Sequence, residues 1–182
     1  MTSIDEISVR AAEIKDAAQI AEIYNQGIQE RSATFETDLR DAEMMREWLI
    51  DHGRKKEPVL VAIRANEKDE LAIKPLILGW TSISSYRNRS CYSGIGEFSV
   101  YVRNGYRGIG IGEKLLLSLI NEAMHLGYWK LLSRIFTFNT ASRTLCKKCG
   151  FREVGIYEKH GKLDGKWLDT VIVEKLISEN LV

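Results

Sequence analysis

The sequence lacks several features that mark particular classes of protein. Its 182 residues include only two prolines and three cysteines, and no apolar run reaches the roughly 18 residues of a membrane-spanning helix. The 26 basic side chains almost equal the 25 acidic ones, so net charge favours neither nucleic acid nor an anionic membrane surface. The first residues do not resemble the basic start of a secretory signal. We therefore expect a cytoplasmic protein without nucleic-acid or membrane partners.

The few cysteines and histidines also argue against a metal site or a disulfide framework. Cys91, Cys146 and Cys149 are compatible with a reducing compartment. Cys146 and Cys149 lie three residues apart within a helical pattern, but no second cysteine or histidine pair completes a tetrahedral site. The three histidines are scattered without the spacing of metal ligands. We expect two neighbouring thiols on a helix and no bound metal.

What the sequence does contain is the pattern of one compact α/β (α+β) domain over residues 1–182. Hydrophobic residues make up 45% of the chain and charged residues 28%, enough for a full-sized core. Residues 64–70 are strongly charged and predict a solvated turn. Apolar spacing predicts strands at 7–11, 59–63, 76–84, 94–102, 131–138, 152–158 and 167–176, with a turn at 162–166. It also predicts helices after Asp16, after Asp41, after a glycine-rich loop and over 139–149.

The most informative segment is residues 97–112, in which an apolar strand runs into a glycine-rich loop that opens a helix. Gly108, Gly110 and Gly112 have no Cβ, so their backbone can approach an anion and direct N–H groups toward it. The loop lacks the last glycine of the dinucleotide fingerprint and the Gly-Lys-Ser/Thr of phosphate-binding NTPases. It therefore predicts a pyrophosphate site of another kind, or else a turn that lets the helix pack on the sheet.

The loop Arg107-Gly-Ile-Gly-Ile-Gly112 resembles the Arg/Gln-x-x-Gly-x-Gly/Ala signature of the GCN5-related N-acetyltransferases, or GNAT family. Residues 139–151 resemble that family's Asn-x-x-Ser-x-x-Leu-(Tyr)-x-x-x-Gly-Phe segment, although a simple helix cap would also explain Asn139 and Ser142. The element order matches as well, so the resemblance covers nearly the whole chain. It implies a mixed central sheet of about six to seven strands, splayed at the cofactor site and flanked by about four helices.

The resemblance also implies which residues hold acetyl-CoA as co-substrate. A strand segment pairs with the cofactor, the glycine loop surrounds its pyrophosphate, and Asn139 and Lys148 lie along its arm. Many members carry a tyrosine at the position of Cys146 to protonate the departing thiolate, so here Cys146, solvent and the ammonium product remain alternatives. The implied cofactor residues are Val100, Tyr101, Val102, Arg107, Gly108, Ile109, Gly110, Ile111, Gly112, Glu113, Asn139 and Lys148.

Residues 80–102 resemble one branch of the family, the phosphinothricin N-acetyltransferases, and residues 32–37 and 166–169 resemble it too. That branch acetylates the α-amine of small amino acids bearing a phosphinate, sulfoximine or arsinate group, and a homodimer is expected. Two arginines supply bidentate donors for a carboxylate and an oxyanion, although an ordinary solvated loop would also contain them. The implied substrate residues are Arg87, Asn88, Arg89, Tyr92, Glu97, Phe98, Ser99 and Phe35.

Glu97 is the candidate general base, because a carboxylate beside the cofactor loop can take a proton from the substrate ammonium. A polar residue on the open face of a strand is the structural alternative. We expect direct transfer in a ternary complex, while Cys91 keeps a covalent route open. Other acceptors, namely protein N-termini or polyamines, and a non-catalytic CoA-binding regulatory domain remain the competing hypotheses.

Overall fold

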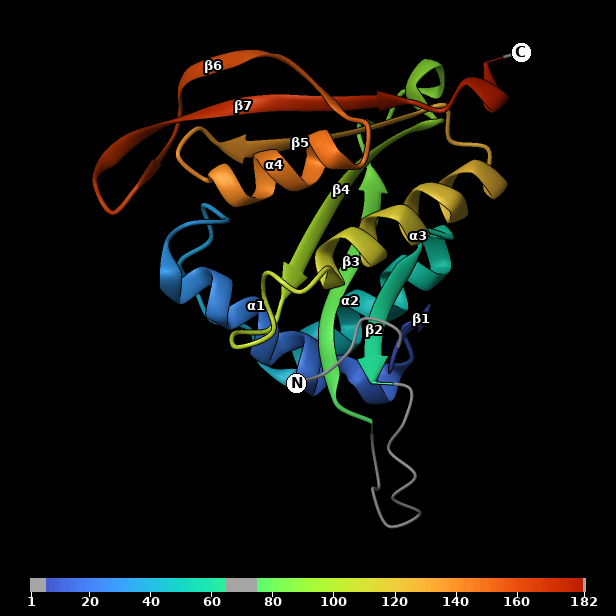
Figure 1. Cartoon of the computed structure of the whole chain (residues 1–182), viewed down its shortest axis with the longest axis vertical. Coiled ribbons are helices and arrows are strands. Elements are labelled where there is room, and N and C mark those ends of the chain that lie inside the picture. Colours follow the sequence, from blue (N-terminus) through green and yellow to red (C-terminus); the bar gives the residue numbers. More distant parts are fainter. Residues whose placement is uncertain (1–5, 65–74, 182) are drawn as a thin grey trace.

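The computed structural model describes residues 6–64 and 75–181 (Figure 1). The expected turn at 64–70 lies outside the described residues except for Arg64, which ends a strand. The strands are β1 (Ile7–Ala11), β2 (Val59–Arg64), β3 (Ile77–Ser85), β4 (Ile95–Val102), β5 (Lys130–Phe136), β6 (Arg152–Leu163) and β7 (Lys166–Leu176). The helices are α1 (Ala17–Glu30), α2 (Ala42–Lys55), α3 (Ile111–His125) and α4 (Thr140–Lys148).

Within the described residues, the seven strands form one mixed sheet in the order β1-β2-β3-β4-β5-β7-β6, and among them only β4 and β5 run parallel. This arrangement confirms the expected fold class and element order. Most element ends differ from the sequence prediction by one or two residues. The exception is β6, which was expected to stop at Glu158 and instead continues to Leu163.

The extended β6 is held by its pairing with β7, which reaches Leu163 opposite Lys166. The turn between them has only two residues, Asp164 and Gly165, both with positive φ (46° and 80°). Two positive φ values match the right-handed twist of a hairpin. The prediction stopped too early because residues 159–163 alternate poorly, and Figure 1 shows the resulting β6–β7 hairpin running past the end of β5.

The central feature of the sheet is the divergence of β4 from β5. Within the described residues, the two strands pair only from Ile95 to Glu97 opposite Lys130 to Leu132. Beyond Glu97, β4 stays paired with β3 as far as Val102, while β5 stays paired with β7 as far as Phe136. The sheet therefore opens into a V, which confirms the expected splayed strands.

The helices cover both faces of the sheet. On one face α3 buries Leu115, Leu116 and Leu119 completely. On the other face α1 and α2 pack against β2 and β3 through a cluster that includes Ile20 and Trp80 (Figure 1). In the part of the chain that the structure describes, no helix is both long and apolar enough to cross a bilayer.

Candidate active site

A cavity of about 430 Å³ lies where the end of β4, the glycine loop and the start of α4 meet; we call it the glycine-loop cavity. It brings together the sequence-predicted cofactor residues with two exceptions. Ile111 is buried in the core at 1% exposure, whereas Ile109 is 41% exposed and is not among the described residues that line the cavity. The predicted residues that line it are Val100, Tyr101, Val102, Arg107, Gly108, Gly110, Gly112, Glu113, Asn139 and Lys148.

The glycines of the loop serve two different purposes. Gly108 and Gly110 have φ values of +80° and +94°, a region that side chains strongly disfavour, and Gly110 is the N-cap of α3. Gly112 instead makes a close approach, since a Cβ there would lie 3.1 Å from the side chain of Leu145 on α4. The helix N-terminus thus faces the cavity with bare backbone, as an anion site requires.

Two cations beside the glycine-loop cavity are held by carboxylates. Arg107 Nη1 donates to Glu30 at 2.8 Å and Lys148 Nζ donates to Glu113 at 2.5 Å. The Lys148 side chain is 65% exposed, so its ion pair is exchangeable with water and other anions. A diphosphate in this cavity would therefore find two cations and a helix N-terminus within one small region.

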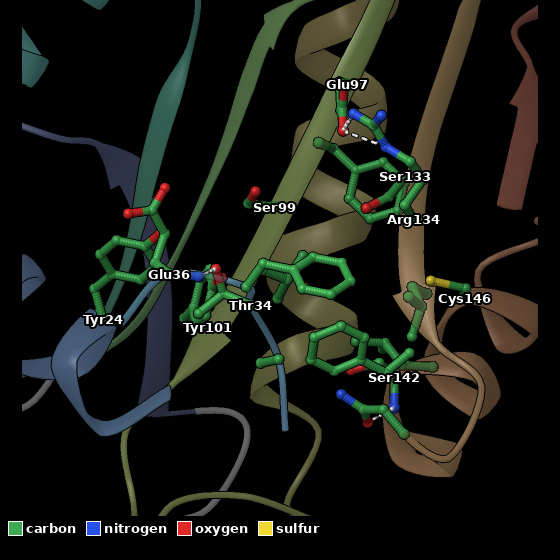
Figure 2. A pocket seen from close by; sticks show the side chains of 18 of the residues that line it. Tyr24, Thr34, Glu36, Glu97, Ser99, Tyr101, Ser133, Arg134, Ser142 and Cys146 are labelled. Atoms are coloured by element: carbon green, nitrogen blue, oxygen red, sulfur yellow. Dashed lines mark hydrogen bonds and ion pairs between the residues drawn. The ribbon is translucent and has the colours of Figure 1, made fainter. Parts of the chain in front are cut away.

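A second cavity, of about 440 Å³, occupies the gap between the diverging strands; we call it the Glu97 cavity (Figure 2). It adjoins the glycine-loop cavity, because Val100, Tyr101, Asn139 and Leu145 line both. Ser99 and Phe98 also line it, and the Phe98 ring packs on Phe151 in the core with ring centroids 4.8 Å apart. The two cavities thus lie side by side, with walls that they share.

Glu97 lies at the apex of the V and is paired with Arg134 of β5. Arg134 Nε donates to Glu97 Oε1 at 3.1 Å, and Nη2 donates to the same oxygen. The pKa of Arg134 is raised, first by this hydrogen bond and then, against the effect of burial, by the charges of Glu97, Tyr86 and Tyr157. Both side chains line the cavity, at 28% exposure for Glu97 and 39% for Arg134.

Arg134 was missed from the sequence. The signal for it was a charged residue in the middle of β5 (Lys130–Phe136), between the apolar residues Leu132 and Ile135. Nothing local distinguishes such a residue from one at a solvated position. Its partner is 37 residues away in the chain, and only the parallel pairing of β4 with β5 brings the two together.

The loop between α1 and α2 closes one side of the Glu97 cavity. Phe35 lines it, and the Phe35 ring meets Phe136 edge to face, with centroids 4.7 Å apart. Asn139 Nδ2 donates to the Ser32 carbonyl at 2.9 Å, while Asn139 Oδ1 accepts from the Ser142 backbone N–H and caps α4. One side chain therefore both starts α4 and anchors the loop.

The other expected substrate residues lie in the loop between β3 and β4, at the same end of β4 as Glu97. Arg87 stacks over the Tyr86 ring at 5.1 Å, and Tyr92 meets that ring edge to face at 5.8 Å. Arg87, Asn88 and Arg89 are exposed. Neither these three residues nor Tyr92 is among the described residues that line the Glu97 cavity. Their link to the site is Tyr86, which contacts Arg87 and Tyr92 and whose charge is among those that raise the pKa of Arg134.

Cys146 lines the Glu97 cavity but is a poor acid there. Burial raises the pKa of its thiol to about 12, and the thiol is 2% exposed. An ordinary thiol has a pKa of about 8.5, so Cys146 would give its proton to a departing thiolate only uphill. Among the described residues, no group of three His, Cys, Asp or Glu side chains could hold a metal ion.

Comparison with known proteins gives a consistent result. The family model described as "Acetyltransferase (GNAT) domain" matches residues 9–172. The chain is 31% identical to phosphinothricin N-acetyltransferase of Streptomyces coelicolor, covering 96% of this chain and 99% of the relative. It is 30% identical to L-methionine sulfoximine/L-methionine sulfone acetyltransferase of Pseudomonas aeruginosa, covering 92% of each. A GNAT phosphinothricin acetyltransferase from Sinorhizobium meliloti, solved with AcCoA, superposes with a TM-score of 0.84 at 27% identity, covering 94% of this chain and 88% of the other.

Proposed function

This chain belongs to the GNAT family and is an N-acetyltransferase that uses acetyl-CoA, and we propose that it acetylates the α-amine of a small amino acid. The proposed amino acid carries an anionic or oxyanion-like side chain, as in phosphinothricin, methionine sulfoximine or arsinothricin. One observation carries the proposal: Glu97 lies at the apex of the β4–β5 divergence, in a cavity that adjoins the glycine-loop cavity.

The residues of the glycine-loop cavity fit the cofactor. Backbone groups of Val100 and Val102 bond the pantetheine arm as an added strand would, and the N–H groups around Gly108 and Gly110 hold the pyrophosphate. Arg107 and Lys148 add positive charge. When bound, acetyl-CoA supplies an acetyl thioester as the electrophile. Positive φ at two glycines and the missing Cβ at Gly112 support this placement.

Glu97 acts as the proton acceptor. The substrate ammonium enters the Glu97 cavity and gives one proton to the carboxylate, directly or through a water, so that a free amine can attack. A backbone N–H within Phe98 to Val102 donates to the oxyanion that develops on the thioester carbonyl. Transfer is direct, in a ternary complex. The departing thiolate takes its proton from solvent or from the ammonium product, in keeping with the high pKa of Cys146.

Arg87 and Arg89, with Asn88 and Tyr92, hold the anionic side chain of the substrate at the rim of the cavity. Their exposed position beside Tyr86 suits a group that enters from solvent. We place the protein in the cytoplasm as a homodimer, where it would give resistance to toxic amino-acid analogues by removing the charge of their α-amine. Protein N-termini and polyamines are the runner-up acceptors.

Thiol release from acetyl-CoA tests the proposal directly. The purified chain is assayed with phosphinothricin, methionine sulfoximine, methionine sulfone, unmodified amino acids, spermidine and a short peptide. Turnover is expected with the first three and is expected to fall strongly in a Glu97→Gln variant. Activity confined to spermidine or to the peptide would refute the substrate assignment while leaving the family intact.

A further inference from the structure

The Glu97–Arg134 pair has a geometry that the proposed base chemistry alone does not need. Its two side chains come from neighbouring strands and face the same cavity, and neither is fully buried. Figure 2 shows the pair at one end of the cavity, with the Arg134 guanidinium turned toward the Glu97 carboxylate. Both hydrogen bonds use a single oxygen, Glu97 Oε1, and the guanidinium edge that carries Nε and Nη2.

Part of each group therefore takes no part in the pair. A guanidinium has five N–H donors, and the Nη1 donors of Arg134 are not used in its bonds to Glu97. Likewise Glu97 Oε2 is not used in them. Each side chain can accordingly engage a second, oppositely charged partner without the pair first being dismantled.

An α-amino acid is a zwitterion whose ammonium and carboxylate are attached to the same carbon. A site that binds both the ammonium and the carboxylate needs an anionic and a cationic side chain next to each other, at the spacing of an ion pair. Glu97 and Arg134 provide this arrangement within the Glu97 cavity. Arg87 does not, because it lies outside the cavity lining, stacked on Tyr86.

We propose that Arg134 binds the α-carboxylate of the substrate while Glu97 receives the α-ammonium. The inference rests on the proposed function and deepens it, because it assigns the acceptor as a free α-amino acid. The guanidinium edge that Glu97 does not use binds the incoming carboxylate, and Glu97 Oε2 meets the ammonium. One N–H bond of the ammonium then breaks, its proton forms an O–H bond on Glu97, and the nitrogen keeps the electron pair with which it attacks the thioester.

This arrangement discriminates among acceptors. A polyamine brings cations but no carboxylate, so it would leave Arg134 without a new partner. A protein N-terminus or an amino-acid amide presents a neutral amide where the carboxylate should be. Losing a charge-assisted, bidentate contact at a site built for it typically reduces kcat/KM by about 10-fold or more. Arg134 is therefore the residue that restricts the enzyme to free amino acids.

The test compares methionine sulfone with its α-carboxamide, using kcat/KM from thiol release. The two amines differ in basicity, so the measured quantity is the acid-to-amide ratio, compared between variants. Wild type is expected to prefer the acid, Arg134→Gln to lower the ratio about 10-fold, and Arg134→Lys to recover part of it. Arg87→Gln is expected to leave the ratio unchanged. Arg152→Gln, which removes an exposed arginine paired with Glu174 away from the cavity, is the control for charge.

Two outcomes would overturn the inference: an unchanged ratio in folded Arg134→Gln, or a ratio that falls in Arg87→Gln instead. Equilibrium binding of both probes to the CoA-saturated protein separates this failure from that of the proposed function. Carboxylate-dependent binding that needs Arg134, without turnover, would refute the function and keep the inference. Equal turnover of the acid and the amide would refute the inference and keep the function. If no amino acid is bound or turned over, both the function and the inference are refuted.

Discussion

Gly161 of β6 lies directly against the ring of Phe35. A Cβ at residue 161 would come within 2.6 Å of Phe35 Cε1, so the loop between α1 and α2 can reach the hairpin only because this residue has no side chain. Arg31 strengthens the same approach by donating to Asp164 in the hairpin turn at 2.9 Å. The wall of the Glu97 cavity thus depends on a contact between two segments that are distant in sequence.

Gly161→Ala is expected to push Phe35 out of place and raise KM for the amino acid, with little change in acetyl-CoA affinity. Overpacking of this kind costs about 1–3 kcal/mol, which corresponds to about 5- to 160-fold in KM if the cost falls on substrate binding. Gly155→Ala on the same strand is the matched control, because a Cβ there has nothing within 4 Å. Steady-state kinetics of both variants decide the matter, and equal effects in the two would contradict the assigned contact.

Glu97→Gln is expected to lower turnover by about 10²–10⁴-fold, the usual value of general-base assistance, with smaller effects on binding of either substrate. The defect should shrink as pH rises toward the pKa of the amine, since the reactive free amine then forms without help. A purely structural role would give a loss that does not depend on pH in this way.

The measurement is a profile of kcat/KM against pH for wild type and Glu97→Gln, with folding checked by circular dichroism. Converging profiles at high pH support the role of base. Parallel profiles with a small constant offset would make Glu97 a substrate-positioning residue and leave a water chain or solvent as the proton acceptor.

Gly110→Val is expected to weaken acetyl-CoA binding by about 1–3 kcal/mol, the value of one or two anion contacts. The residue has φ of +94°, a conformation that a β-branched side chain avoids, so the loop must shift away from the pyrophosphate. Ile109→Ala, at an exposed neighbouring position, is the control. Calorimetry that finds unchanged affinity in a folded Gly110→Val protein would refute the placement of the pyrophosphate.

Arg87→Ala is expected to raise the apparent KM for an amino acid with an anionic side chain far more than it alters acetyl-CoA binding. Arg87→Lys should restore only part of the affinity, because the compact ammonium of lysine cannot make the two parallel hydrogen bonds of a planar guanidinium. The check is KM for phosphinothricin beside KM for a neutral amino acid. Wild-type KM in both variants on every anionic amino acid would exclude Arg87 from recognition.

His52 is expected to make stability depend on pH. Burial lowers its pKa, outweighing its hydrogen bond to the Trp48 carbonyl and the negative charge of Glu57. The unfolded chain therefore binds this proton more readily, and the free energy of unfolding should fall as pH drops below about 6.5. Urea unfolding between pH 8 and 5 should show a smaller change of the unfolding free energy with pH in His52→Gln than in wild type. The same dependence of unfolding free energy on pH in both proteins would contradict a buried, neutral imidazole.

Most of the fold could be predicted from local patterns. The spacing of Leu115, Leu116 and Leu119 predicts α3, and Asn139 predicts the start of α4 through its capping side chain. The end of β6 could not be predicted, because pairing with β7 resumes at Gly161 after an irregularity that begins at Tyr157, and it does not follow from the alternation of these residues. The length of β6 is therefore set by the β6–β7 hairpin and not by the local sequence.

The sequence by itself determined the glycine loop, because the requirements of that loop are local. Positive φ at Gly108 and Gly110 and a helix N-terminus beside them are all encoded within a few residues. Only the tertiary structure decided the rest of the site. The parallel pairing of β4 and β5, and its end at Glu97, set Arg134 against that carboxylate. Contacts between residues far apart in the chain depend on strand order and register, which no local pattern specifies.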